Sequence, residues 1–247
     1  MNKLWQQNPP RRAGYVERLC DHTYLPRMLD SDSIIIDLGA NRGEFAHELI
    51  RRSGCRVHAV EPLSCLYTHI PPSPRLTLYP IAIGGSNGRA RLKVFRSRCA
   101  SLLASRQNET ALQEEDVDVL DLHSLLALIG AEHIDLMKVD VEGAELDMLE
   151  SALSSDLERI GLMTIEFHDF IYPEQRPRVE SIKGRLRSIG FRLINFSLDN
   201  TDVLFINRTI GIGAFEFRKL KYFDKYVEGF KRKIRRFGSR PPRQAFV

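Results

Sequence analysis

Seven short runs of apolar and β-branched residues recur along the chain and predict strands. They lie at residues 33–37, 56–60, 76–83, 134–139, 161–167, 191–196 and 202–207. Segments with helical spacing lie between most of them; Leu146, Leu149 and Leu153, for example, follow the fourth run at intervals of three and four residues. Strands that alternate with helices, the early ones apolar through their length, predict a mainly parallel sheet covered on both faces. We therefore expect an α/β doubly wound domain.

Two places depart from this alternation. The runs at 191–196 and 202–207 are joined by SLDNT alone, and its Asp199-Asn200 pair is typical of a turn, so we expect an antiparallel hairpin there. A second hairpin is predicted within residues 81–95, because Asn87-Gly88 suits a type I′ turn. Residues 97–116 are polar and weakly patterned, which indicates a loop or lid.

The pattern divides the chain of 247 residues into one large domain with two appendages. We expect an N-terminal helical or capping segment at 1–30, the α/β domain at 31–210, and a basic amphipathic extension at 211–247. The longest apolar runs fall far short of the ~20 residues of a membrane-spanning helix. The first residues also lack the apolar stretch of a secretory signal, so we expect a cytoplasmic protein. The four cysteines have no CxxC spacing, which favours reduced structural thiols over zinc or disulfides.

The first candidate site follows the first predicted strand, in the sequence DLGANRGEF. Asp37, Gly39 and Gly43 bracket a tight strand-to-helix turn, where glycine lets the backbone approach a ligand. Many such turns use glycine only to turn. Glu61, however, ends the second strand 24 residues after Asp37, where a carboxylate can accept the two hydroxyls of a ribose. Together these residues predict a cofactor that contains a nucleoside.

The spacing of the glycines narrows the choice of cofactor. Nicotinamide dinucleotides usually require GxGxxG, whereas this chain has GxxxG, and it has no phosphate-binding P-loop. S-adenosylmethionine has a ribose and no phosphate, so it fits better. A terminal antiparallel hairpin is also the way in which class I methyltransferases complete their sheet.

Five sequence blocks then carry a family resemblance: IIIDLGANRGEF, VHAVEP, VLDLHSLL, IDLMKVDVEGAELDMLESAL and IEFH. Their order and spacing over about residues 33 to 170 resemble the FkbM-type S-adenosylmethionine-dependent methyltransferases, and KVDVEGAE is the most specific of them. The resemblance implies a Rossmann-like enzyme, typically an O-methyltransferase of polyketide, sugar or glycolipid hydroxyls. It also implies that the cofactor site includes Asp37, Gly39, Ala40, Asn41, Gly43 and Glu61.

The block KVDVEGAE crowds three carboxylates into six residues. Asp140 ends the fourth strand, in the centre of the sheet, and is the best-placed base or substrate anchor. Glu142 follows in the loop and Lys138 precedes on the strand, while His168 after the fifth strand has an imidazole that can accept a hydroxyl proton. The simpler reading remains open: Lys138 and Asp140 form an ion pair and His168 is a loop histidine. We expect Glu145 to be an exposed residue of the first helical turn, favoured by the helix dipole.

A metal ion is the other explanation for clustered acids. Four side chains offer oxygen and imidazole ligands of the kind that Mg²⁺ or Mn²⁺ binds, namely Asp140, Glu142, Glu166 and His168. Their spacing is not diagnostic, so a divalent metal is an alternative and S-adenosylmethionine alone is the expected cofactor.

The C-terminal residues carry a charge that the total of +4 conceals. Residues 218–243 contain eleven lysines and arginines against Asp224 and Glu228, so this segment carries +9 and the rest of the chain −5. Apolar residues repeat through it at helical spacing: Leu220, Phe223, Val227, Phe230, Ile234 and Phe237. Such a helix can cover its own domain, lie on anionic lipid, or bind RNA.

The sequence thus predicts a methyltransferase that acts on a hydroxyl of a sugar, glycolipid or polyketide-type molecule. Its expected partner is a small-molecule or glycan acceptor. Peripheral membrane contact through the basic helix is an alternative to packing of that helix on its own domain, and a nucleic acid is not the favoured partner. The alternatives are a methyltransferase of RNA ribose hydroxyls and a non-catalytic module that binds membrane or RNA through the tail.

Overall fold

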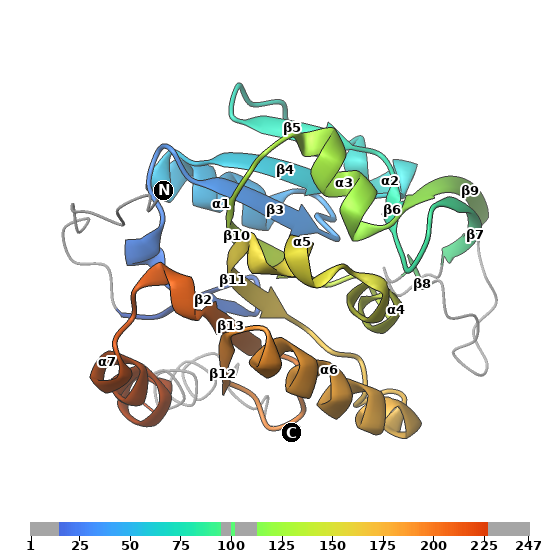
Figure 1. Ribbon diagram of the computed structural model, residues 1–247. Coiled ribbons are helices and arrows are strands. Elements are labelled where there is room, and N and C mark those ends of the chain that lie inside the picture. Colours follow the sequence, from blue (N-terminus) through green and yellow to red (C-terminus); the bar gives the residue numbers. More distant parts are fainter. Residues whose placement is uncertain (1–14, 95–99, 102–112, 227–247) are drawn as a thin grey trace, which may run out of the picture.

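The computed structural model describes residues 15–94, 100–101 and 113–226, and its centre is a seven-stranded sheet (Figure 1). The strand order is β12-β13-β11-β10-β3-β4-β5, and within this sheet only β13 runs antiparallel to its neighbours. The strands are β3 (Ile34–Leu38), β4 (Arg56–Val60), β5 (Leu76–Tyr79), β10 (Ile134–Val139), β11 (Ile160–Ile165), β12 (Phe191–Asn195) and β13 (Val203–Asn207). The predicted α/β sheet and its C-terminal hairpin are confirmed.

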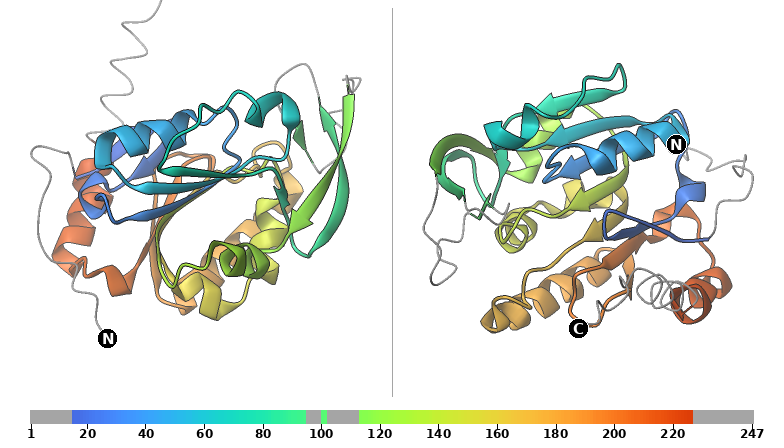
Figure 2. Two further views of the ribbon diagram at one scale, coloured as in Figure 1. Left: turned by 90° about the horizontal axis from the view of Figure 1, so that it is seen from above. Right: turned by 180° about the vertical axis from the view of Figure 1, so that it is seen from behind.

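Helices cover both faces of this sheet, as the two views in Figure 2 show. One face carries α3 (Leu122–Ile129), α4 (Glu145–Ser151), α5 (Ser154–Glu158) and α6 (Arg176–Ser188); the other carries α1 (Glu44–Ser53) and α7 (Ala214–Lys219). Because side chains alternate along a strand, Ile36 and Met137 enter the core under the first set, whereas Ile35 and Leu136 enter the core under the second. This alternation also decides which face receives the polar residues at the strand ends.

The N-terminal segment lies against the face that carries α1. Its described part, residues 15–30, forms a hairpin of β1 (Glu17–Leu19) and β2 (His22–Tyr24) followed by the 3-10 turn η1 (Pro26–Met28), where we expected a helical or capping segment. Asp202, at the start of β13, accepts hydrogen bonds from the backbone N and Oγ1 of Thr23 at 2.9 and 2.7 Å. The hairpin is thereby fixed on the sheet near the carboxyl ends of the parallel strands.

A smaller sheet beside the main one corrects two predictions. The order of its strands is β6-β9-β7-β8, with β6 (Ala82–Ile83), β7 (Gly88–Val94), β8 (Ala100–Ser101) and β9 (Gln113–Leu120). The predicted strand 76–83 is therefore two strands in different sheets, interrupted at Pro80, which has no N–H for a ladder.

The hairpin predicted at Asn87-Gly88 is wrong. The strands β6 and β7 do not pair with each other, because both pair with β9. Neither Asn87 nor Gly88 has the positive φ that a type I′ turn requires. Instead the Asn87 side chain binds the start of α3, accepting from the backbone N of Asp121 at 2.8 Å and donating to Ser124 Oγ at 2.8 Å.

The predicted loop at 97–116 is described only in part. Residues 113–116 belong to β9, and 102–112 lie outside the described residues. The remaining elements are α2 (Ser64–Tyr67), η2 (Pro173–Gln175), η3 (Arg208–Ile210) and the π-helical turn η4 (Leu220–Asp224). Among the described helices, none combines the length and the apolar character that a crossing of the bilayer demands.

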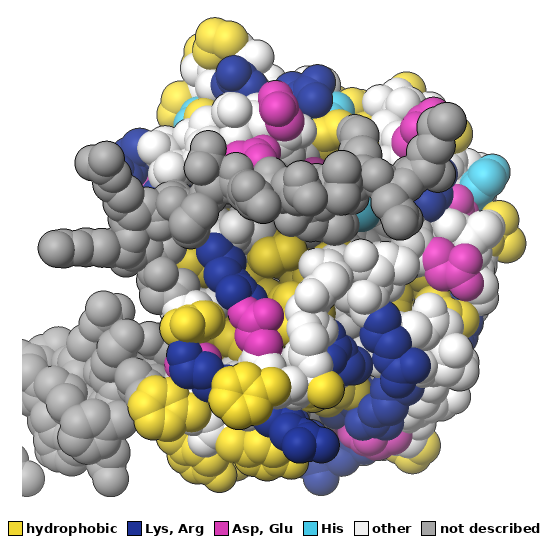
Figure 3. Space-filling model, turned by 60° about the vertical axis from the view of Figure 1, so that its left-hand side comes forward, with side chains coloured by type: hydrophobic (Ala, Val, Ile, Leu, Met, Phe, Trp, Pro, Cys, Tyr) yellow, Lys and Arg dark blue, Asp and Glu magenta, His cyan; other side chains and the backbone are white. Residues whose placement is uncertain are grey.

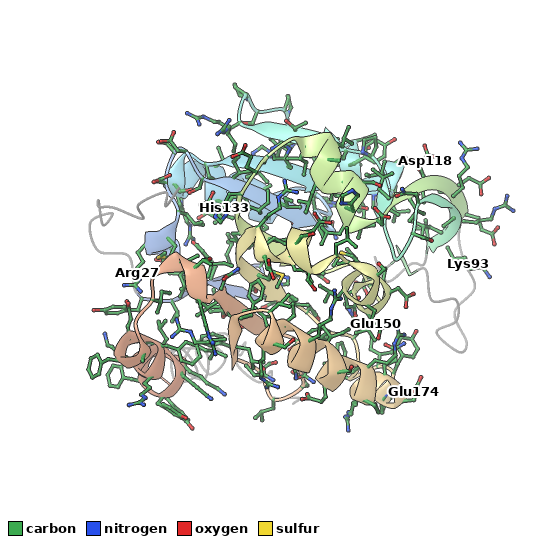
Figure 4. The ribbon with its side chains drawn as sticks, in the orientation of Figure 1. Arg27, Lys93, Asp118, His133, Glu150 and Glu174 are labelled. Atoms are coloured by element: carbon green, nitrogen blue, oxygen red, sulfur yellow. The ribbon has the colours of Figure 1, made fainter. Side chains whose placement is uncertain are left out.

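The described start of the C-terminal extension is docked on the domain. Leu220 is fully buried in the core, and Arg27, labelled in Figure 4, forms an ion pair with Glu216 of α7. Phe223 of the expected apolar stripe is instead 61% exposed. The rest of that stripe, from Val227 onward, lies outside the described residues.

Candidate active site

A cavity opens beyond the carboxyl ends of β3, β4 and β10, where ligands bind in open α/β sheets. One end is polar and includes Lys138, Asp140 and Glu142; the other is apolar and is formed by Leu63, Leu66, Ala82, Ile83 and Leu92. Glu61 lies on the wall, together with the backbone of Gly39, Ala40 and Asn41. The cavity therefore offers one surface for a flat apolar group and one for charged groups.

The loop between β3 and α1 depends on two glycines for different reasons. Gly39 has φ of +76°, and a Cβ there would lie 1.8 Å from the backbone oxygen of Asp140. The glycine thus lets the β3 loop cross directly over the exit of β10. Gly43, with φ of +79°, precedes α1 in the left-handed conformation.

Glu61 holds this loop from the end of β4. Its Oε2 accepts from the backbone N of Asn41 at 2.8 Å, and its Oε1 accepts from the backbone N of Leu63 at 3.1 Å. Burial raises the pKa of Glu61 to about 7, although the two backbone donors and the Lys138 ammonium favour the charged form. A ligand that adds hydroxyl donors to this carboxylate would offset the cost of burying its charge.

Asp37 and Lys138 are register partners on adjacent strands and form a buried ion pair. Lys138 Nζ lies 3.2 Å from Asp37 Oδ1 and donates to the backbone oxygen of Gly39 at 2.8 Å. Burial opposes the charge on Lys138, but the neighbouring carboxylates of Asp37 and Asp140 outweigh it, so its pKa is raised. Lys138 therefore ties the β3 loop to β10, and Asp37 lies beneath the cavity without lining it.

Asp140 lies between three cationic or imidazole groups. Its Oδ2 is 3.7 Å from Lys138 Nζ and 3.5 Å from His22 Nε2, and its Oδ1 is 3.9 Å from His168 Nε2. Burial raises the pKa of Asp140, but Lys138, His22 and His168 together hold it well below its usual range. The group is therefore a permanent carboxylate and suits an anchor for a hydroxyl better than a store for its proton.

Glu145 corrects the expectation of an exposed carboxylate on the first helical turn. It is fully buried, and its Oε1 accepts from the backbone N and lies 3.0 Å from Nδ1 of His168, while its Oε2 accepts from Gly143 N at 2.8 Å. The helix α4 begins at this residue, so the side chain points back over the loop and not into solvent.

His168 is the partner of that carboxylate. Burial alone would lower the pKa of His168, but the hydrogen bond with Glu145 and the charges of Glu145, Glu142 and Asp140 raise it to about 9. At neutral pH the imidazole is protonated, which favours a fixed positive charge over an acceptor of a hydroxyl proton.

Two further acids complete the polar end. Glu142 has φ of +52°, an uncommon conformation for a residue with a side chain, and its Oε2 lies 3.5 Å from His168 Nε2. Glu166 follows β11, and burial with the charges of Asp140 and Glu142 raises its pKa to about 7, against the opposing charge of His168. The four residues that the sequence offered as metal ligands fall into two groups that share Asp140: one contains Glu142 and His168, and the other contains Glu166 with His22.

The structure gathers the predicted site residues unequally around the cavity. Gly39, Ala40, Asn41, Glu61, Lys138, Asp140 and Glu142 line it, whereas Asp37, Gly43, Glu166 and His168 do not. The N-terminal hairpin adds two residues that the sequence analysis did not identify. Cys20 lines the cavity, and His22 faces Asp140. No local motif marks either residue, because only the docking of the hairpin brings them to the strand ends.

A mainly parallel seven-stranded sheet with one antiparallel strand inserted near its edge, and a cavity with an acid at the end of β4, define a Rossmann-like methyltransferase fold of class I. The comparison with known families agrees. The profile of the methyltransferase FkbM domain matches residues 37–193, more than half of the chain. The chain therefore belongs to the FkbM family of S-adenosylmethionine-dependent methyltransferases.

Individual relatives are distant. The AMB antimetabolite synthetase AmbE of Pseudomonas aeruginosa is 22% identical over 208 residues, which is 67% of this chain and 10% of AmbE, so the chain spans about a tenth of that relative. Among solved structures, an rRNA methylase from Streptococcus thermophilus is 14% identical with a TM-score of 0.43, covering 74% of this chain and 90% of that one. A precorrin-6y C5,15-methyltransferase from Geobacter metallireducens is 11% identical with a TM-score of 0.37, covering 72% and 80%. The fold class rests on the strand order itself and not on these two structures.

Proposed function

We propose that this protein transfers the methyl group of S-adenosylmethionine to a hydroxyl of a sugar, glycolipid or polyketide-type small molecule. The observation that carries the proposal is the single cavity that joins Glu61 at one side to Asp140 at its polar end. Family membership supports the methyl donor, and the charged end of the cavity supports a polar acceptor.

In the proposed complex the adenine lies against the apolar wall that includes Leu63, Leu66 and Leu92, and the ribose hydroxyls donate to Glu61. The cofactor's methionine part then extends under the loop of Gly39 toward Lys138 and Asp140. This arrangement directs the sulfonium methyl to the end of the cavity where the carboxylates gather.

The acceptor hydroxyl is proposed to donate a hydrogen bond to Asp140, which aligns its oxygen with the methyl group. Asp140 stays charged, because Lys138 and the two imidazoles hold its pKa low. In this proposal Lys138 and protonated His168 keep the carboxylate in place, and Glu142 covers the acceptor from the loop.

The test is direct. Calorimetry with S-adenosylhomocysteine measures whether the cofactor site exists, and transfer of radiolabel from methyl-labelled S-adenosylmethionine to a panel of sugars, glycolipids and polyketides measures the acceptor class. Absence of S-adenosylhomocysteine binding would remove the enzymatic proposal and leave the non-catalytic binding module.

A second proposal concerns the surface around α7 and η4. Phe215, Tyr222, Phe223 and Tyr226 are each more than 60% exposed, and Arg218, Lys219 and Lys221 lie among them in the sequence. In Figure 3, hydrophobic and basic side chains lie together on the lower part of the surface. Because this view is turned about the vertical axis from Figure 1, the same level in Figure 1 is that of α7. Aromatic and basic residues on one short helical segment favour peripheral contact with anionic lipid, which would suit a lipid-linked acceptor.

A further inference from the structure

The N-terminal hairpin buries His22 beside the carboxyl ends of β10 and β11. The side chain is fully buried, and within the described residues neither of its ring nitrogens has a hydrogen-bond partner. Its Nε2 points at Asp140, with Oδ2 at 3.5 Å, and its ring packs edge-on against Phe45. Buried polar atoms are nearly always paired, so an imidazole in this position indicates a ligand that the protein alone does not supply.

A second carboxylate faces the same point. Glu166 directly follows β11, and ligand atoms of His22, Asp140 and Glu166 all lie within 4.8 Å of one another. The three side chains come from three separate segments, the hairpin and the ends of two adjacent strands. Asp140 is 28% exposed and lines the cavity, so the point of convergence can be reached from it.

We propose that His22, Asp140 and Glu166 bind one divalent transition-metal ion at the polar end of the cavity. Protein ligands lie about 2.0–2.2 Å from such an ion, so ligand atoms around it are roughly 3 to 4.4 Å apart. The ligand atoms of the cluster lie within 4.8 Å of one another, and His22 Nε2 is 3.5 Å from Asp140 Oδ2. The imidazole favours Mn²⁺, Fe²⁺ or Zn²⁺, because sites for Mg²⁺ and Ca²⁺ consist of oxygen ligands.

Negatively charged groups outnumber positively charged ones around this point, which favours a bound cation. Asp140, Glu142 and Glu166 place three carboxylates in this end of the site. Two positive groups face them: Lys138, which lies 3.2 Å from Asp37 and 3.7 Å from Asp140, and the imidazole of His168. The same Asp140 also faces Glu142 and His168, which form a second group of three candidate ligands. The Nδ1 of His168 lies 3.0 Å from Glu145 Oε1, whereas within the part of the chain that the structure describes neither ring nitrogen of His22 has a hydrogen-bond partner. His22 is therefore the imidazole that still requires a ligand, and the proposal is placed on its group.

The metal site is argued independently of methyl transfer, but the role of the ion in catalysis rests on the proposed function. A metal at Asp140 would bind the oxygen of the acceptor directly and favour its deprotonated form, which makes it a better nucleophile. Neighbouring hydroxyls of a sugar or a catechol could share the ion, so the acceptor class becomes molecules with vicinal hydroxyls.

The test is a titration of the 247-residue chain with Mn²⁺, followed by electron paramagnetic resonance of the free ion. We expect one site per chain, weakened at least tenfold in both His22→Leu and Glu166→Gln, and unchanged in the control His69→Leu, whose histidine is exposed. The substitution His22→Leu keeps an apolar contact for Phe45, and urea unfolding checks that each variant is folded. If His22→Leu does not fold, Glu166→Gln carries the test.

The proposal is overturned if no Mn²⁺ binds at a concentration of about 1 mM, which is the range of weak metal sites in proteins. It is also overturned if folded His22→Leu and Glu166→Gln bind Mn²⁺ as tightly as the wild type, or if only His168→Gln loses binding. Binding of Mn²⁺ is measured without a methyl donor or acceptor. A protein that binds Mn²⁺ but transfers no methyl group would therefore refute the proposed function and leave the metal site standing.

Discussion

Glu145 Oε1 lies 3.0 Å from both the backbone N and the Nδ1 of His168, and both side chains are buried. This pair joins the first turn of α4 to the segment after β11, directly behind Asp140. Burial would lower the pKa of His168, but Glu145 with the nearby carboxylates raises it to about 9, which favours a cation over a proton acceptor. The consequence can be measured through stability.

We expect Glu145→Gln to destabilise the protein by about 3 kcal/mol, because it leaves a buried imidazolium without its partner. The stabilisation by His168 is fully present below pH 6.5 and is lost as pH rises through about 9, since the folded pKa is raised. The difference in unfolding free energy between wild type and variant should therefore shrink from pH 7 to pH 10.

Urea unfolding in buffer with chelator measures this difference, and Asp147→Asn, an exposed carboxylate on the same helix, is the matched control. Glu61 and Glu166 also have raised pKa values of about 7, but they reduce stability as pH rises from 4.5 to 7, below this window. If the free energies of unfolding of wild type and Glu145→Gln differ by a constant amount above pH 7, the pairing of Glu145 with His168 is contradicted.

Binding of S-adenosylhomocysteine should strengthen about tenfold between pH 6 and pH 8. Burial holds the pKa of Glu61 at about 7. In the proposed complex both oxygens of Glu61 accept from the ribose hydroxyls, which requires the ionised carboxylate. Calorimetry in buffers of different ionisation enthalpy should also detect proton release near pH 7.

One test variant and one control variant complete the measurement of S-adenosylhomocysteine binding. Glu61→Gln should bind weakly at every pH and lose the pH dependence. Glu115→Gln is the control, because Glu115 also accepts from a backbone N–H, that of Ser64, but does not line the cavity. A flat pH profile in wild type would show that Glu61 does not receive the ribose.

Gly39→Ala should cost more than about 3 kcal/mol of stability, because its Cβ would lie 1.8 Å from the Asp140 oxygen and φ is +76°. Gly54→Ala is a matched control: its φ is +70°, but the nearest atom to its Cβ is 3.6 Å away, so only the conformational strain of about 1 kcal/mol applies. Thermal and urea unfolding measure both. Equal effects would mean that the close crossing of the two loops is absent in solution.

Asp140→Asn should leave the affinity for S-adenosylhomocysteine within about twofold and reduce kcat by about 100-fold or more, because in the proposed complex it removes the charge that orients the acceptor hydroxyl. Asp135→Asn, at the opposite end of β10, serves as the control for charge loss on the same strand. The radiolabel transfer assay gives kcat and KM. Full activity in Asp140→Asn would end its assignment as the anchor.

The double variant Phe223→Ser with Tyr226→Ser should reduce co-sedimentation with anionic vesicles several-fold, because both aromatic side chains are exposed. Leu128→Ser, which removes an exposed apolar residue from α3 on another part of the surface, is the control. Unchanged sedimentation of the double variant, or equal sedimentation with neutral vesicles, would contradict the lipid contact.

The sequence by itself determined the architecture of the main sheet. Apolar runs such as residues 134–139 specify buried strands, because this signal is local. The glycine turn after Asp37 and Glu61 at the end of the next strand predict the edge at which the cofactor binds. The meeting of Asp140 with Glu166 was also predictable, since adjacent parallel strands end at the same edge.

Only the tertiary structure decided which residues complete the site. The sequence predicts that Glu145 is an exposed residue at the start of a helix. In the structure the segment after β11 places His168 against it, and Glu145 is buried. His22 carries no local signal at all, because its position depends on the bonds between Thr23 and Asp202, which are 179 residues apart. Local patterns fix which segments are buried, whereas long-range packing fixes which polar groups those segments bring into contact.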